Sequence, residues 1–284
     1  MRSSNLLRAG SFTGAMAAVL LVDFWPILAQ SADSELTAHR AVYELNLARQ
    51  NNKSGTVAAR GRILYDFSGN VCEGYKLEFR QVSELDNGEG RVSLSDLRSN
   101  TWEDGAGKAY QFKSQNFLNE RPVDAVDGRA ERRENAIAVT LIKPKDRKMD
   151  LETATIFPTE HVRRIIEAAR GGKTILEFPV YDGSESGEKV YNTLTVIGRE
   201  IAANTRPPTD AASGHQVLKD MKRWPVTVSY FDKSAKGGEQ VPVYSISFEL
   251  YDNGIARALM LDYNDFAVSG ELKTLEISSS KACP

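Results

Sequence analysis

Cysteine and histidine are scarce in this chain, which has 2 cysteines and 3 histidines among its 284 residues. A zinc site needs cysteine or histidine ligands grouped at short spacing, and His39, His161 and His215 have no second ligand at such a spacing. A C-x-x-C pair, which lowers a thiol pKa for redox chemistry, is also missing. The sequence therefore predicts no metal site and argues against a zinc metalloprotease or a dithiol oxidoreductase.

The chain also lacks an excess of charge of one sign, because its formal net charge is -2. Short basic clusters occur in "RAERRE" (129–134) and "KPKDRK" (143–148). No aromatic side chain stands beside either cluster to stack on bases, so both are interpreted as solvated turns or strand edges. This composition argues against a nucleic-acid partner.

Catalytic motifs are missing as well. "YDGSESGEK" (181–189) places Glu185 where a nucleophile elbow needs serine, and is interpreted as a solvated hairpin loop. "EDGAGKAY" (103–110) has Trp102 where a Walker loop needs its first glycine. One enzymatic alternative stays open, a glycosidase-type pair of carboxylates on a hydrolase of envelope polysaccharide. The candidates are Asp66, Glu78, Glu249, Asp252, Asp262 and Asp265.

Long apolar runs are confined to the first thirty residues. Arg2 and Arg8 precede the run "GAMAAVLLVDFWPILA" (14–29), and the small residues "AQSA" follow it. This order predicts a secretory signal peptide at 1–31, cleaved after Ala29 or Ser31, with an uncleaved signal anchor as the alternative. Residues 32–284 are then one exported domain with no integral membrane segment.

The predicted export affects how the two cysteines are interpreted. In an oxidising compartment an even count favours a structural bridge, and only Cys72–Cys283 is available. Cys72 is expected in an early strand, and Cys283 is the next-to-last residue. The loop that they close spans nearly the whole mature chain, for which chain entropy gives an upper figure of about 5 kcal/mol. A redox role is the rival interpretation.

Most of the exported domain alternates apolar and polar residues with the period of two that is typical of strands. "HRAVYELNLAR" (39–49) is one such segment, and Asn253-Gly254 between two others predicts a hairpin. About fourteen strands are counted in this way. The one clearly irregular stretch is "NTRPPTDAASGHQ" (204–216), interpreted as a surface loop.

One segment, 159–170, has helical spacing instead. Its apolar residues Val162, Ile165, Ile166 and Ala169 fall at i, i+3, i+4 and i+7. Thr159 is the expected N-cap, and Gly171 the expected C-terminal stop. The apolar stripe is expected to plug or cover one face of a curved sheet.

A sheet of about fourteen strands must curl or close to protect its edges, which predicts a mainly-β fold with one principal helix. A concave face of that size can enclose an apolar cavity. The candidate lining residues are Tyr75, Phe79, Tyr244, Phe248, Tyr251, Leu259 and Leu261. The alternative is a core filled by these side chains and the helix.

Several stretches together resemble the EipB family of alphaproteobacterial periplasmic cell-envelope integrity proteins. They are "AHRAVYELNLA", "GRILYDFSGNVCEGY", "FPVYDGSESGEKVY" and "SISFELYDNGIARALMLDYNDFAVSGELKTLE". The resemblance implies a spiral, unclosed β-barrel crossed by a helix and similar to the LolA and LolB lipoprotein carriers. It also implies a Cys72–Cys283 disulfide and a periplasmic partner with tetratricopeptide repeats.

The resulting functional hypothesis is a non-enzymatic periplasmic protein without a cofactor that maintains the cell envelope. It would act by binding a protein or a lipid-like partner on a disulfide-stabilised curved sheet. A carrier of lipid or of lipoprotein acyl chains is the first alternative. The polysaccharide hydrolase is the second.

Overall fold

The computed structural model describes residues 35–51, 55–234, 241–278 and 283. The predicted signal peptide at 1–31 lies outside these residues and stays a prediction. Residues 34–284 form one compact unit. Among the described residues, no helix has the length and apolar character that crossing a bilayer requires.

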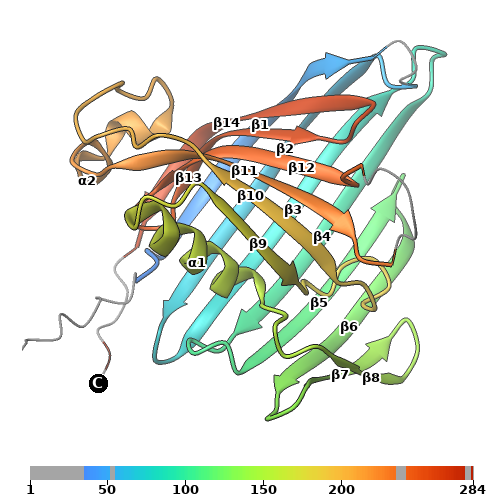
Figure 1. The fold of residues 1–284 in the computed structure, drawn as a ribbon. Coiled ribbons are helices and arrows are strands. Elements are labelled where there is room, and N and C mark those ends of the chain that lie inside the picture. Colours follow the sequence, from blue (N-terminus) through green and yellow to red (C-terminus); the bar gives the residue numbers. More distant parts are fainter. Residues whose placement is uncertain (1–34, 52–54, 235–240, 279–282, 284) are drawn as a thin grey trace, which may run out of the picture. The chain divides into compact units, whose positions relative to one another are not determined.

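In the described part of the chain, fourteen antiparallel strands form a single sheet, as the sequence predicts (Figure 1). The strands are β1 (His39–Gln50), β2 (Ala58–Asn70), β3 (Gly74–Asp86), β4 (Val92–Glu103), β5 (Ala109–Leu118), β6 (Arg121–Arg132), β7 (Ile137–Lys143), β8 (Arg147–Leu151), β9 (Ile175–Val180), β10 (Tyr191–Ile197), β11 (Arg223–Asp232), β12 (Tyr244–Tyr251), β13 (Ala256–Asp262) and β14 (Phe266–Ile277). Across the sheet, the strands run in descending order from β8 to β1 and then in descending order from β14 to β9. β1 and β14 therefore pair at the middle of the sheet, and β8 and β9 are its edges.

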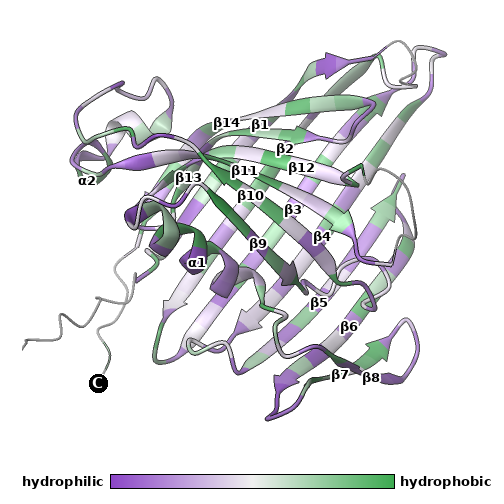
Figure 2. Cartoon of the chain, in the orientation of Figure 1, coloured by the Kyte–Doolittle hydropathy of each residue, from purple (hydrophilic) through white to green (hydrophobic). Residues whose placement is uncertain are grey.

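The period-two alternation of the sequence corresponds to the two faces of this sheet. In β1, Ala41, Tyr43 and Leu45 are buried, whereas Arg40 before them and Asn46 after them are exposed. Figure 2 shows hydrophobic and hydrophilic residues alternating along many strands. The predicted hairpin at Asn253-Gly254 joins β12 to β13, and Gly254 has a φ of 89° that favours glycine.

The sheet curls until its two edge regions meet without closing. No ladder joins β8 to β9 among the described strands. Instead, Ile156, which follows β8, forms an isolated parallel bridge with Val180 at the end of β9. Beside this bridge, Phe112 of β5 meets Tyr181 edge to face at 5.6 Å between ring centroids. The result is the unclosed, spiral barrel that the family resemblance implies.

The helix α1 (Pro158–Arg170) agrees with the predicted helix at 159–170 except at its start. Thr159 is not the N-cap, because the helix begins at Pro158 after an extended Phe157 that supplies no side-chain cap. The capping oxygens come from a distant strand instead: Glu103 of β4 accepts from the amides of Thr159 and Glu160, each at 2.7 Å. Gly171 ends the helix as predicted, and α1 packs on β9 and β10.

The stretch 204–216 is more ordered than the sequence indicates. It contains a 3-10 turn, Ala211–Gly214, and the short helix α2 (Gln216–Lys219) begins at its end. The Asp210 side chain accepts a hydrogen bond from the Ala212 amide at 3.1 Å. Ala212 and Leu218 are buried in the core against β1 and β14, so packing orders a segment whose composition indicates a loop.

The two cysteines are bonded to each other as a disulfide with a Cα–Cα distance of 5.8 Å, across 211 residues of sequence. Cys72 does not lie in a strand as expected but in the turn between β2 and β3. Asn70 makes that turn, because its Oδ1 accepts from the amides of Cys72 and Glu73 at 2.8 and 2.9 Å.

Candidate functional site: an apolar cavity inside the curled sheet

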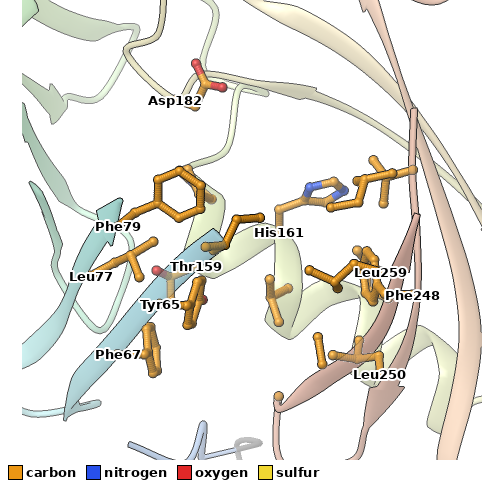
Figure 3. A pocket seen from close by; sticks show the side chains of 18 of the residues that line it. Tyr65, Phe67, Leu77, Phe79, Thr159, His161, Asp182, Phe248, Leu250 and Leu259 are labelled. Atoms are coloured by element: carbon orange, nitrogen blue, oxygen red, sulfur yellow. The ribbon is translucent and has the colours of Figure 1, made fainter. Parts of the chain in front are cut away.

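The concave side of the sheet encloses a cavity of about 470 Å³. Its walls come from β2, β3 and β11–β13, with α1 along one side (Figure 3). α1 lines this space rather than filling it. The volume falls within the range of about 300–1,000 Å³ that is typical of small-molecule sites.

Two opposing walls of the cavity are apolar. Tyr65 and Phe67 of β2 stand beside Leu77 and Phe79 of β3 on one side. Phe248, Leu250 and Leu259 stand on the other, and residues of α1 lie between the two walls. The aromatic wall is ordered by stacking, since Tyr65 contacts His39 at 5.4 Å and Phe67 at 6.2 Å between ring centroids.

The structure brings five of the seven sequence-predicted lining residues to this cavity: Phe79, Tyr244, Phe248, Leu259 and Leu261. Tyr75 and Tyr251 lie in the core instead, where they are 2% and 0% exposed. Tyr75 stacks on Phe67 at 5.4 Å between ring centroids. Both tyrosines stand at the hairpin end of a strand, where neighbouring segments cover the ring. The alternation of the sequence shows which face a residue is on but not whether its ring is covered.

Sequence reasoning missed the cavity residues His161, Tyr230 and Asp182. Asp182 follows β9 in "YDGSESGEK", for which the sequence predicts a solvated hairpin loop. That interpretation is wrong for the start of the loop, because Tyr181 is fully buried and its hydroxyl donates to the Gly187 carbonyl at 2.7 Å. A Cβ on Gly183 would lie 2.4 Å from the Phe112 ring, so the loop backbone packs directly on β5. The signal available in the sequence for a packed loop was one tyrosine and two glycines within these nine residues.

The carboxylates that were candidates for a hydrolase lie outside this cavity, as far as the described lining residues show. Asp66 pairs with Arg40 at 2.6 Å, and Asp262 with Arg49 at 2.7 Å. Asp252 pairs with Arg170 at 2.7 Å. These contacts occupy the carboxylates with structural ion pairs.

Glu249 belongs to a more buried ionic cluster. It accepts hydrogen bonds from Arg223, at 2.7 Å, and from Arg257. Burial alone would raise the pKa of Glu249, but the two arginines outweigh it and lower that pKa. Arg257 also pairs with Asp210 at 2.8 Å. We name Arg223, Glu249, Arg257 and Asp210 the arginine cluster; it ties the 204–219 segment to β11–β13.

The histidines that face the cavity are neutral at neutral pH. Burial lowers the pKa of His39, whose Nδ1 donates to the Thr37 carbonyl at 2.7 Å. Burial also lowers the pKa of His161 to about 4. The Nε2 atom of His161 lies 3.5 Å from the Thr193 hydroxyl and 3.4 Å from that of Thr195, which anchors α1 to β10.

Comparison with known proteins places the chain in a family. The EipB-like family model matches residues 30–279. The cell envelope integrity protein EipB of Brucella abortus (strain 2308) is 36% identical over 268 residues, which cover 93% of each chain. A crystal structure of a beta-barrel-like protein of a domain of unknown function, also from Brucella abortus, is similar with a TM-score of 0.79 and 36% identity over 86% of this chain and 99% of the solved one. The chain belongs to the EipB-like family.

Proposed function

We propose that this protein acts in the periplasm, without enzymatic activity, to maintain the cell envelope by binding a lipid-like molecule in the cavity between β2–β3 and β12–β13. The observation that carries this proposal is the apolar cavity of about 470 Å³. The name of the Brucella abortus relative, a cell envelope integrity protein, supports the envelope role. The predicted signal peptide supports the location.

The energetic argument rests on the chemistry of the walls. Each methylene that leaves water for an apolar site contributes about 0.8 kcal/mol. Aromatic and aliphatic side chains on both walls match an alkyl chain along its length, and a preformed cavity does not have to be ordered on binding. The carrier alternative, in which the same cavity takes lipid or lipoprotein acyl chains as in the LolA and LolB proteins, uses this geometry too.

A blocking substitution tests the proposal. Leu77→Trp places a large ring in the cavity, whereas Leu118→Trp adds the same ring at an outward position that is 44% exposed. We expect a deletion strain to be sensitive to detergent and to cell-wall antibiotics, and Leu118→Trp but not Leu77→Trp to restore resistance. Lipid bound to protein from the periplasm should be detected by native mass spectrometry in Leu118→Trp only. Full complementation by folded Leu77→Trp would contradict the proposal.

A partner with tetratricopeptide repeats stays a prediction from the family resemblance. Cross-linking in intact cells followed by purification of the tagged protein tests it, with the deletion strain as the control. The partner should be recovered equally with Leu77→Trp if it binds the outer face, and poorly if it requires a filled cavity.

A further inference from the structure

The described cavity lining contains an acidic side chain but no lysine or arginine. Among these described residues, Asp182 is the one carboxylate. His39 and His161 are kept neutral by burial. An anionic head group would therefore enter a low-dielectric space that offers it no counter-charge and contains a carboxyl group, which is costly. A cationic head group would instead have an acidic partner in Asp182 and would meet no lysine or arginine among the described lining residues.

Asp182 is held firmly, and burial raises the pKa of its carboxyl while the hydrogen bonds from Ser184 oppose that rise. A cationic head group beside it would favour the ionised form. The Asp182 Oδ1 accepts a hydrogen bond from the Ser184 amide at 2.9 Å, and the buried Tyr181 and Gly183 fix the backbone on either side. Within the described part of the chain, no lysine, arginine or histidine forms an ion pair with Asp182. The neighbouring Lys189 is engaged elsewhere, at 2.6 Å from Glu185 and 3.3 Å from Asp232.

Two aromatic rings line the same cavity as this carboxylate. Tyr230 of β11 and Tyr244 of β12 stack with 4.4 Å between ring centroids. Burial raises the pKa of both tyrosines, and the Asp182 carboxylate raises it further. A carboxylate and aromatic rings that line one cavity can each attract an ammonium group, the first through ion pairing and the second through cation–π attraction. Figure 3 shows Asp182 apart from the labelled apolar side chains, toward one end of the site.

We propose that the cavity selects a single-chain amphiphile with a cationic ammonium head group, which Asp182, Tyr230 and Tyr244 hold while the alkyl chain lies between the apolar walls. This inference rests on the proposed lipid-binding function and adds the chemical class of the ligand. The cavity volume fits one chain better than a two-chain phospholipid.

Three chain-matched probes test the head group below their critical micelle concentrations: dodecyltrimethylammonium, dodecanoate and the neutral monolauroylglycerol. Calorimetry should give a dissociation constant for the ammonium probe at least about tenfold lower than that for dodecanoate, which is about 1.4 kcal/mol. Asp182→Asn should remove this preference and leave the affinity for the neutral probe within about twofold, since the amide oxygen can still accept from Ser184. Asp124→Asn, an exposed carboxylate on β6, is the charge-matched control and should behave as the wild type.

Circular dichroism and thermal melting first establish that each variant is folded. Tyr244→Leu, which keeps the carboxylate and removes one ring, should weaken binding of the ammonium probe more than binding of the neutral probe. Equal affinities for the two charged probes, or an unchanged preference in folded Asp182→Asn, would overturn the head-group inference alone. Failure of all three probes to bind would overturn the proposed lipid-binding function itself.

Discussion

Glu103 accepts a hydrogen bond from the Thr159 amide at 2.7 Å, although the two residues are far apart in sequence. This carboxylate on β4 caps the first turn of α1, where unpaired amides and the helix dipole favour a negative group. It is 3% exposed. The contact fixes the start of the helix that forms one side of the cavity.

Replacing Glu103 by alanine should destabilise the protein by about 1–3 kcal/mol, because it leaves the half-buried amides of Thr159 and Glu160 without this acceptor. Urea denaturation followed by circular dichroism measures the loss. Glu131→Ala is the matched control, since Glu131 forms an exposed pair with Arg129 at 3.6 Å. An equal, small effect of both substitutions would contradict the capping role.

The same carboxylate predicts a pH dependence. Burial raises the pKa of Glu103 to about 7 from the ordinary value of 4.5, even though the two amide hydrogen bonds favour the ionised form. The folded state then binds a proton more tightly than the unfolded state, so this group's contribution to stability falls as pH rises from about 4.5 to 7. The difference in melting temperature between wild type and Glu103→Ala should shrink over that range. A difference that grows with pH would refute the assignment.

His161 should act in the opposite direction. Its pKa is lowered by burial to about 4, below the ordinary 6.5, so acid favours the unfolded state and stability rises with pH between about 4 and 6.5. His161→Gln should be less sensitive to acid than the wild type in melting experiments. Equal acid sensitivity of the two proteins would contradict this role of His161.

The disulfide should contribute strongly to stability. Cys72→Ser and Cys283→Ser are each expected to lower the melting temperature, and the double variant should match either single one, because a single bond is lost in all three. Chain entropy gives an upper figure of about 5 kcal/mol. Reduction of the wild type with dithiothreitol should reproduce the shift, and no change on reduction would refute the prediction.

Breaking the arginine cluster should cost more than breaking a surface pair. Asp210→Ala leaves Arg257, whose side chain is 12% exposed, with Glu249 alone, and should destabilise by about 3 kcal/mol. Asp66→Ala removes the pair with the exposed Arg40 and should cost less than about 1 kcal/mol. Equilibrium unfolding of both variants checks the contrast. Similar losses would show that burial does not set the difference.

Local pattern in the sequence was enough for the strands, the Asn253-Gly254 hairpin and the body of α1. Alternation in "HRAVYELNLAR" reports which side of β1 meets the core, because successive side chains of a strand point to opposite faces. The two-cysteine count allowed one pairing. It did not place Cys72 in its turn, since the Asn70 side chain decides that turn through contacts that alternation does not describe.

The sequence by itself thus determined a mainly-β chain with one principal helix, a family membership and a disulfide. Only the tertiary structure decided which inward residues line the cavity and which fill the core. Tyr75 and Phe79 share one face of β3, yet the first is closed over by Phe67 and the second borders open space. Asp182, which follows the edge strand β9, lines the same cavity as Leu77 and Phe79 of β3, because the sheet curls. Curvature depends on contacts between strands distant in sequence, so no local pattern encodes it.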